Sequence, residues 1–230
     1  MPAIHLIRHG QASFGQRNYD ALSERGFAQS RVLGASLRAM LPRAFATTCG
    51  TLQRHRQTAT ACLEAMGHAA QWQDDAGWNE FDHDPVIAAL NPEYADADRL
   101  RSDMLAATDP RRAFQALFER AVARWAGGAH DEDYAEPWPV FRARCHAALQ
   151  RLVATLPAST DAIVFTSGGP ICAITQELLR IPDSEGFKLN WTHVNCGVTK
   201  LISGRQGVSL STFNGYAHFA GAHAELVTYR

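Results

Sequence analysis

The chain has 230 residues, of which 46% are hydrophobic, and its 22 basic and 23 acidic side chains give a formal net charge of −1 at pH 7. This length and composition exclude a disordered chain and predict one large domain, or a domain with an insertion. The balanced charge excludes a general field that would attract nucleic acid or an anionic membrane. No stretch approaches the roughly 20 apolar residues of a membrane span and the N-terminal run is too short for a signal peptide, so we expect a cytoplasmic protein.

The N-terminal part of the chain predicts a strand followed by a helix. The short apolar run 4–7 ends in Arg8-His9-Gly10, which is typical of a buried strand that leads into a loop. Ser23 is a suitable cap for a helix that Pro42 ends. The apolar residues that recur on one face of this predicted helix are Leu33, Leu37, Met40 and Leu41.

The alternation continues and is then interrupted. The pattern predicts a strand over 44–48 and a helix over 53–66 that Gly67 ends. From about 81 to 136 the strand signal is absent and helical spacing dominates, so we interpret this segment as a helical insertion. A further amphipathic helix is predicted from Phe141 to Leu156. The helical spacing within the insertion is clearest at Phe114, Leu117, Phe118, Ala121, Val122 and Trp125.

The C-terminal part contains the strongest strand signal of the chain. The apolar run 162–166 ends in Ser167-Gly168-Gly169-Pro170, and Pro170 is well placed to begin a helix that ends at Leu179. The runs 198–202 and 208–213 resemble a hairpin. The five cysteines are odd in number and form no C-x-x-C pair, so we expect reduced, buried thiols and no zinc site. They are Cys49, Cys62, Cys145, Cys172 and Cys196.

Two predicted turns carry positive charge next to a candidate nucleophile. In Arg8-His9-Gly10-Gln11 an imidazole lies next to a guanidinium, on a loop that glycine allows to approach a ligand closely. This suits attack on an anion, although such a pair at a strand end is often only a hydrogen-bonded loop. In a doubly wound fold the helix turn that contains Arg54 lies at the same sheet edge, so Arg54 is a second candidate ligand for a phosphate. We interpret Arg56 as solvent-exposed.

A carboxylate between aromatic residues follows at Glu80. Such surroundings suit a general acid that protonates an alkoxide leaving group. The neighbouring Asp82, His83 and Asp84 also suggest metal ligands, but the sequence has no comparable cluster elsewhere to complete a site. Metal is therefore the lesser interpretation, and we expect no metal and no organic cofactor.

Taken together, these segments resemble the histidine phosphatase (phosphoglycerate mutase-like) superfamily. The resemblance extends from residue 4 to about residue 212, and its strength lies in an ordered set of motifs, each modest alone. The matching parts are Leu6-Ile7-Arg8-His9-Gly10-Gln11 with the signature, 19–26 with the stretch after it, Leu52-x-Arg54-His55-x-x-Thr58-Ala59 with the second-arginine motif, Glu80 with the proton donor and Ser167-Gly168-Gly169 with the last pocket motif.

The resemblance implies a fold and a mechanism. The fold is a single domain over 1–230, a three-layer α/β/α sandwich with a mostly parallel central sheet of about six strands and a helical cap insertion at about 81–136 over the active site. The implied activity is that of a metal-independent phosphomonoester phosphatase of the histidine acid phosphatase type, with a phosphohistidine on His9. Arg8 and Arg54 would spread the charge of the phosphoryl oxygens, and Glu80 would act as general acid and base. The second ring nitrogen of His9 should then donate to a backbone carbonyl.

The resemblance also implies a small phosphorylated substrate as partner, with no nucleic acid and no membrane. The sequence leaves the substrate's identity open, and the oligomeric state as well, a homodimer included. Phosphate or substrate contacts are expected from Gln11, Ser167, Gly168 and His83. Side chains that either line the pocket or only pack are Trp78, Tyr94, Trp125 and Trp138.

Two positions depart from the superfamily pattern. Ser167 stands where the superfamily has its second pocket histidine, which removes a positive charge and costs on the order of 10²-fold or more in rate if nothing compensates. Phe14-Gly15 stands where an asparagine is usual, and the Gly15 N–H is a candidate replacement. His83 is the first candidate to compensate for the missing histidine, ahead of His55, His193 and His218.

Three other functions compete with a phosphatase. A phosphomutase is less favoured, because the stretch after His9 lacks the tryptophan- and asparagine-rich pattern of such enzymes. A catalytically impaired phosphoester-binding protein is suggested by Ser167 and Gly15, but a binder has no need of both a nucleophile and an acid. A serine hydrolase that uses Ser167 is a poor match, because Phe165 stands where the nucleophile elbow has glycine.

Overall fold

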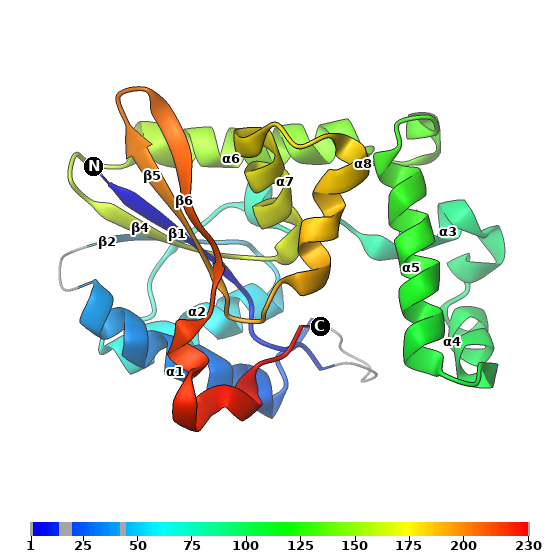
Figure 1. Ribbon diagram of the computed structural model, residues 1–230, viewed down its shortest axis with the longest axis horizontal. Coiled ribbons are helices and arrows are strands. Elements are labelled where there is room, and N and C mark those ends of the chain that lie inside the picture. The colour runs from blue at the N-terminus through cyan, green and yellow to red at the C-terminus, as the bar shows by residue number, and fades with distance from the viewer. Residues whose placement is uncertain (1, 14–19, 42–44, 230) are drawn as a thin grey trace.

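The computed structural model describes residues 2–13, 20–41 and 45–229, and its centre is a six-stranded mixed sheet of order β3-β2-β4-β1-β5-β6 (Figure 1). The first four strands in this order are parallel, whereas β5 and β6 form an antiparallel hairpin whose first strand pairs with β1. The strands are β1 (Ala3–Arg8), β2 (Phe45–Cys49), β3 (Gln73–Asp74), β4 (Asp161–Thr166), β5 (Val198–Gly204) and β6 (Gly207–Gly215).

Helices cover both faces of the sheet, which explains why its central strands are apolar along nearly their whole length. Successive residues of β4 point to opposite faces: Val164 joins the core cluster beneath α6 and α7, and Phe165 joins the cluster beneath α1 and α2. The fold is thus the expected three-layer sandwich. The four helices are α1 (Glu24–Met40), α2 (Gln53–Met66), α6 (Trp138–Thr155) and α7 (Gly168–Leu179).

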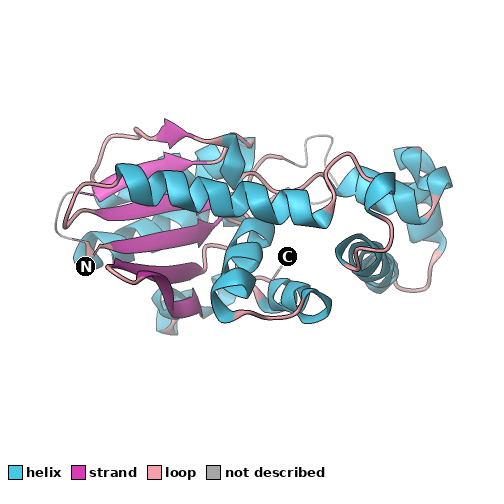
Figure 2. Ribbon diagram, turned by 90° about the horizontal axis from the view of Figure 1, so that it is seen from above, coloured by secondary structure: helices cyan, strands magenta, loops and turns pink. Residues whose placement is uncertain are grey.

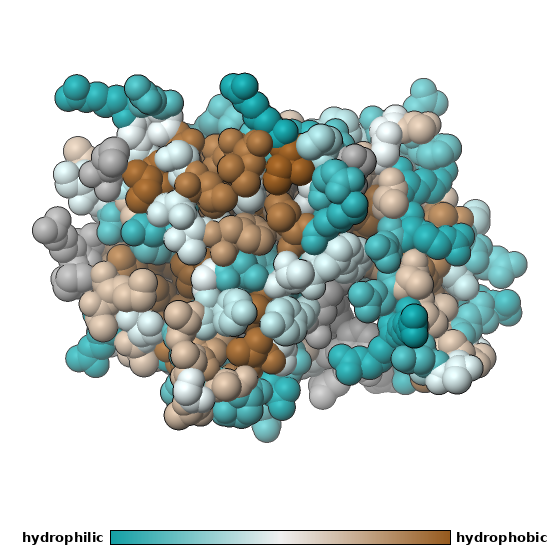
Figure 3. All heavy atoms as spheres, viewed as in Figure 1, coloured by the Kyte–Doolittle hydropathy of each residue, from teal (hydrophilic) through white to brown (hydrophobic). Residues whose placement is uncertain are grey.

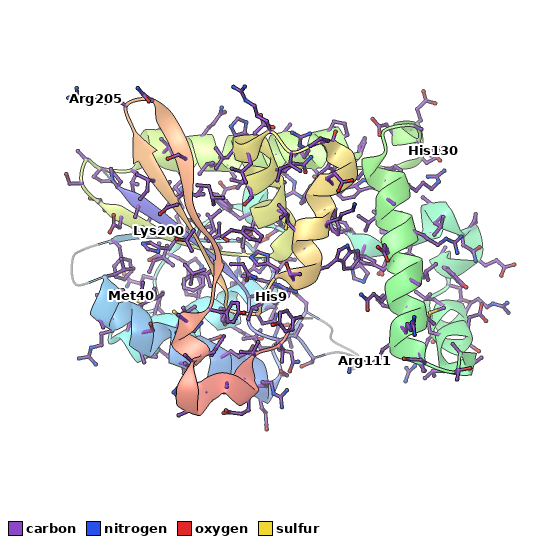
Figure 4. The ribbon with its side chains drawn as sticks, viewed as in Figure 1. His9, Met40, Arg111, His130, Lys200 and Arg205 are labelled. Carbon is purple, nitrogen blue, oxygen red and sulfur yellow. The ribbon has the colours of Figure 1, made fainter. Side chains whose placement is uncertain are left out.

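The ends of α1 and α2 follow the local signals in the sequence. The Ser23 hydroxyl accepts a hydrogen bond from the Gly26 N–H at 3.1 Å and so caps α1. Gly67 ends α2 with a left-handed φ of 81°. The prediction that Met40 lies on the apolar face of α1 is wrong, because Met40 is 61% exposed in the last turn of the helix (Figure 4). Leu41, the next residue, is buried instead. Pro42 and Ala44 lie outside the described residues.

The segment expected to be a helical insertion is helical, and its helices lie beside the carboxyl edge of the parallel strands (Figure 2). Aspartates at 82, 96 and 109 cap three of these helices by accepting backbone N–H groups, which explains why they begin where they do. Within this region the ring centroids of Phe81 and Trp125 are 4.5 Å apart. Trp125 also connects the region to α6, because its ring centroid is 5.0 Å from that of Trp138. The helices are α3 (His83–Leu90), α4 (Ala97–Ala106) and α5 (Pro110–Ala126).

The remaining elements complete the third layer. Helix α7 begins at Gly168, two residues before the expected start at Pro170, and α8 (Asp183–Gly186) and the 3₁₀ helix η4 (Phe187–Thr192) follow it. Apolar side chains gather over β6 and α7 on the face shown in Figure 3. All five cysteines are free and buried, as expected. None of the described helices is long and apolar enough to cross a membrane.

Candidate active site

His9 lies directly after β1, at the carboxyl edge of the sheet (Figure 4). Its backbone N–H donates to the Thr166 carbonyl at the end of β4, at 2.9 Å. Its Nδ1 is 2.7 Å from the Gly10 carbonyl oxygen, which can only accept, so Nδ1 carries the proton. Burial, and then the charges of Arg54 and Arg8, hold the pKa of His9 well below its usual range. The ring is therefore neutral at pH 7 and has its lone pair on Nε2, the form that a nucleophile needs.

The backbone of this loop is held against α1 and α2. Gly10 donates its N–H to the Thr58 hydroxyl at 3.0 Å, which gives the threonine of the second-arginine motif a structural role. A Cβ at Gly10 would lie 2.5 Å from the Gly26 carbonyl oxygen, so only glycine allows the loop to pack this closely on the start of α1. The carbonyl that orients His9 is thereby fixed in place.

Two guanidinium groups line the same cavity as His9. Arg8 is 6% exposed and donates through Nη1 to the His193 carbonyl. Arg54, in the first turn of α2, donates through Nη1 to an Asp20 carboxylate oxygen at 2.7 Å. Arg56 instead forms an exposed ion pair with Asp74, as expected. Two guanidiniums around a neutral imidazole suit a phosphate dianion, because each presents a planar fork of donors.

The Glu80 carboxylate enters the cavity from the loop before α3. Its Oε2 accepts the Gly169 N–H at 3.1 Å, and its Oε1 accepts the Phe81 N–H at 3.3 Å. The preceding Asn79 ties this loop to the one before α2, since its Oδ1 accepts the Thr51 N–H and its Nδ2 donates to the Thr51 hydroxyl, both at 2.7 Å. The loop that carries Glu80 and the loop before the Arg54 turn are thus joined by hydrogen bonds.

The cavity has a volume of about 170 Å³ and contains five of the eight site residues that the sequence predicts, namely Arg8, His9, Arg54, Glu80 and His83. His83 stands at the start of α3, with Nε2 3.2 Å from an Asp84 carboxylate oxygen. The sequence left open whether four candidate aromatic residues line the pocket or only pack, and the structure shows that they pack. Three of the expected residues are buried core side chains and Tyr94 packs against that core, because Trp125 and its neighbours bind the cap to α6. The wall consists of Phe81, Phe114 and Phe118.

Three predicted contact residues do not line the cavity. Gln11 turns toward the cap of α1, where its Oε1 accepts from the Ser23 hydroxyl at 3.1 Å. Ser167 is fully buried, and its hydroxyl is 2.6 Å from Nε2 of His55. Gly168 provides the first turn of α7, and a Cβ there would meet the Asn190 side-chain oxygen at 2.1 Å. Gly15 lies outside the described residues.

Two asparagines of the cavity wall were missed by sequence reasoning. Asn195 donates through Nδ2 to the His9 carbonyl at 3.1 Å and so supports the backbone of His9. Asn190 is 5% exposed, and its buried Oδ1 has no hydrogen-bond partner among the described residues. Both lie in irregular or 3₁₀ segments after α7, where no periodic pattern marks a site. The histidine that contacts Ser167 is His55. Sequence reasoning favoured His83 over His55 as the residue that compensates for the missing histidine.

A shared cation has little support among the described residues. Asp82, His83 and Asp84 are the one group of potential ligands there whose candidate atoms lie within 4.8 Å of one another. Both aspartates are exposed and begin α3, where Asp82 already serves as the N-cap. We therefore do not assign this cluster as a metal site, whereas the His83 ring itself lines the cavity.

Comparison with known proteins places these motifs in one family. A family model described as histidine phosphatase superfamily (branch 1) matches residues 4–215, a range that includes every residue of the cavity wall. No curated protein sequence matches the chain.

Several solved structures share the fold. A mycobacterial glucosyl-3-phosphoglycerate phosphatase has a TM-score of 0.64 at 20% identity, covering 94% of this chain and 100% of its own. A phosphoglycerate mutase from Bacillus anthracis has a TM-score of 0.64 at 15% identity, covering 95% of both chains. A phosphoserine phosphatase mutant from Entamoeba histolytica, in complex with phosphoserine, has a TM-score of 0.57 at 15% identity, covering 95% and 99%. At these identities the likeness establishes the fold.

Proposed function

Because the chain belongs to branch 1 of the histidine phosphatase superfamily, we propose that it is a phosphatase that hydrolyses phosphomonoesters through a phosphohistidine on His9, without a metal ion. One observation carries the proposal. A neutral imidazole whose Nδ1–H donates to the Gly10 carbonyl shares a cavity with two guanidiniums and the Glu80 carboxylate. This is the combination of nucleophile, charge and proton donor that phosphoryl transfer requires.

In the first half-reaction the lone pair on Nε2 of His9 attacks phosphorus, and the bond from phosphorus to the ester oxygen breaks. Arg8 and Arg54 hold the phosphoryl oxygens as charge redistributes. Glu80, protonated at this stage, gives its proton to the leaving oxygen, so the product departs as a neutral alcohol.

In the second half-reaction a water molecule attacks phosphorus while the Glu80 carboxylate takes its proton. The bond between phosphorus and Nε2 breaks, and the electron pair returns to the imidazole. Inorganic phosphate leaves with His9 neutral and Glu80 protonated, as at the start. Ser167 and His83 are proposed to contact the bound group, the first at the phosphoryl oxygens and the second at the rest of the substrate.

The substrate class is a small phosphomonoester whose alcohol part lies against the aromatic wall of Phe81, Phe114 and Phe118. The solved neighbours suggest which compounds to test first, because their descriptions mention glucosyl-3-phosphoglycerate and phosphoserine. Phosphoserine, 3-phosphoglycerate and sugar phosphates therefore form the core of the panel, with an aryl phosphate added to test the aromatic wall.

The test measures phosphate release from this panel, with and without a chelator, for the wild type and His9→Ala. We expect release that survives the chelator and falls at least about 10³-fold in the variant. The matched control is His223→Ala, which removes an exposed histidine outside the cavity wall and should keep the wild-type rate. Undiminished release by His9→Ala refutes the mechanism. Binding of inorganic phosphate without any release indicates the phosphoester-binding protein, and return of the phosphoryl group to a second alcohol indicates a mutase.

A further inference from the structure

A second imidazole lies beside His9 and comes from a different element. His55, in the first turn of α2, has its ring centroid 5.8 Å from that of His9. Its Nε2 is 2.6 Å from the hydroxyl oxygen of Ser167, the residue that follows β4 and precedes α7. The two side chains come from positions 112 residues apart, and neither has measurable solvent exposure. A buried pair at hydrogen-bond distance beside the nucleophile needs an explanation.

The surroundings of His55 determine which of its nitrogens carries the proton. Burial, and then the charge of Arg54, hold the pKa of His55 well below its usual range, so the ring has one N–H. Its Nδ1 is buried without a hydrogen-bond partner among the described residues and faces Gly50, where a Cβ would lie 2.2 Å from it. A buried N–H without an acceptor is rarer than a bare lone pair. The proton is therefore on Nε2, which donates to Ser167.

This assignment leaves the Ser167 hydroxyl proton available. Ser167 occupies the N-cap position of α7 but accepts no backbone N–H of that helix through its side chain. Among the described residues, its hydroxyl has His55 as its one hydrogen-bond partner, and there it is the acceptor. Its own proton can therefore be donated elsewhere. The backbone carbonyl of Thr166, the residue before it, accepts the His9 N–H at 2.9 Å, so the end of β4 that carries Ser167 lies beside the His9 backbone. The His55 ring, to which the hydroxyl is hydrogen-bonded, has its centroid 5.8 Å from that of His9.

We propose that His55 is a positioning residue that orients the Ser167 hydroxyl as a donor to the phosphoryl group on His9. The proposal rests on the proposed function, since it assigns the pair to the same phosphate site. In this arrangement the imidazole and the hydroxyl act as one chain of donors, with His55 Nε2–H to Ser167 Oγ and Ser167 O–H to a phosphoryl oxygen. In this site the imidazole comes from α2, and the residue after β4 is a serine that donates to the phosphoryl group.

The test compares two substitutions of His55 that differ in one property. Gln has an Nε2 donor at nearly the same distance from the backbone, whereas Leu fills similar space and has none. We expect H55L to lose about 10- to 100-fold in kcat/KM and about 10-fold in affinity for inorganic phosphate, and H55Q to stay within about threefold of the wild type in both. Thermal unfolding of both variants shows whether stability differs. If H55L and H55Q have equal kcat/KM and equal phosphate affinity, the ring is only a packing residue and the proposal is wrong.

An exchange of the two side chains gives an independent answer if H55L does not fold. His55 Nε2 is 2.6 Å from the Ser167 hydroxyl oxygen, so the new ring in S167H clashes with the His55 ring. We therefore expect lower activity than in the wild type. The double variant S167H/H55A moves the imidazole to the end of β4 and should regain at least about 10-fold over S167H. Purely additive effects overturn the proposal. Phosphate affinity distinguishes failure of the proposed function from failure of this inference. A wild type that binds phosphate without turnover contradicts the proposed function, while the phosphate affinity of H55L still tests the role of His55. A wild type that binds no phosphate contradicts both.

Discussion

Gly169 offers a way to displace the proposed proton donor without altering it. Its N–H donates to Oε2 of Glu80 at 3.1 Å, and a Cβ added there would lie 1.9 Å from Oε1 and 3.0 Å from the carboxyl carbon. The methyl group of Gly169→Ala cannot coexist with the carboxylate in its present place. The clash involves the end of a side chain and, at 3.2 Å, the Phe141 ring, so we expect a loss of about 1–3 kcal/mol in the free energy of unfolding and a native fold.

The effect on catalysis depends on the leaving group. General acid catalysis contributes about 10²- to 10⁴-fold, so a displaced Glu80 should lower kcat/KM for an alkyl phosphate such as phosphoserine by about 10²-fold or more. A p-nitrophenyl leaving group departs as a stable anion and needs little protonation, so its kcat/KM should fall by about 10-fold or less. The selectivity between the two substrates is therefore the measured quantity.

Steady-state kinetics with both substrates give this ratio, because kcat/KM reports the first half-reaction and excludes the later attack of water. Gly215→Ala is the matched control, since its new Cβ meets nothing closer than 3.4 Å and lies outside the cavity wall. Equal losses of kcat/KM on the two substrates would falsify the reasoning, because displacement would then disturb the phosphate site and not proton donation. No loss on the alkyl phosphate would show that Glu80 is not the acid.

Two further predictions concern Arg54 and His193. Arg54→Lys keeps the positive charge but loses the planar guanidinium that binds Asp20 and would bind phosphate. We expect kcat/KM to fall about 10- to 100-fold while the free energy of unfolding changes by less than about 1 kcal/mol. Wild-type kinetics in this variant would mean that charge alone suffices. For His193, burial and then the Arg8 charge lower the pKa to about 3 in the folded protein, whereas the unfolded chain titrates near 6.5. The unfolded state therefore binds the extra proton first, and the free energy of unfolding decreases as pH falls from about 6.5 toward 3. Urea unfolding of His193→Leu at pH 7 and pH 5.5 should show a pH-dependent loss about 1 kcal/mol smaller than in the wild type, and an identical loss would exclude this role for His193.

The core of the site could be predicted from the sequence because its signals are local. An apolar run that ends in Arg8-His9-Gly10 specifies a strand and the loop that follows it, and the carboxyl ends of parallel strands meet at one edge. Arg54 follows from the same rule, as the first turn of the helix after β2. The caps at Ser23 and Gly67 are equally local, since each depends on one residue's hydrogen bonding or φ. Short-range stereochemistry therefore determined the central strands, the helices α1 and α2, and the charged residues at the sheet edge.

The partners of those residues depend on contacts that no local pattern contains. Helical spacing in α5 marks Phe118 and Trp125 alike as inward-facing, and both belong to the same buried core. Only the packing of the cap on α6 determines that Phe118 also lines the cavity and Trp125 does not. The sequence alone indicates that a pocket histidine is missing at Ser167. Only the fold brings His55, 112 residues away in the chain, to hydrogen-bond distance of Ser167. The order of residues along the chain encodes hydrophobic periodicity and the residue types of turns. Which elements pack against one another decides whether a polar pair is buried, and that is a property of the tertiary structure.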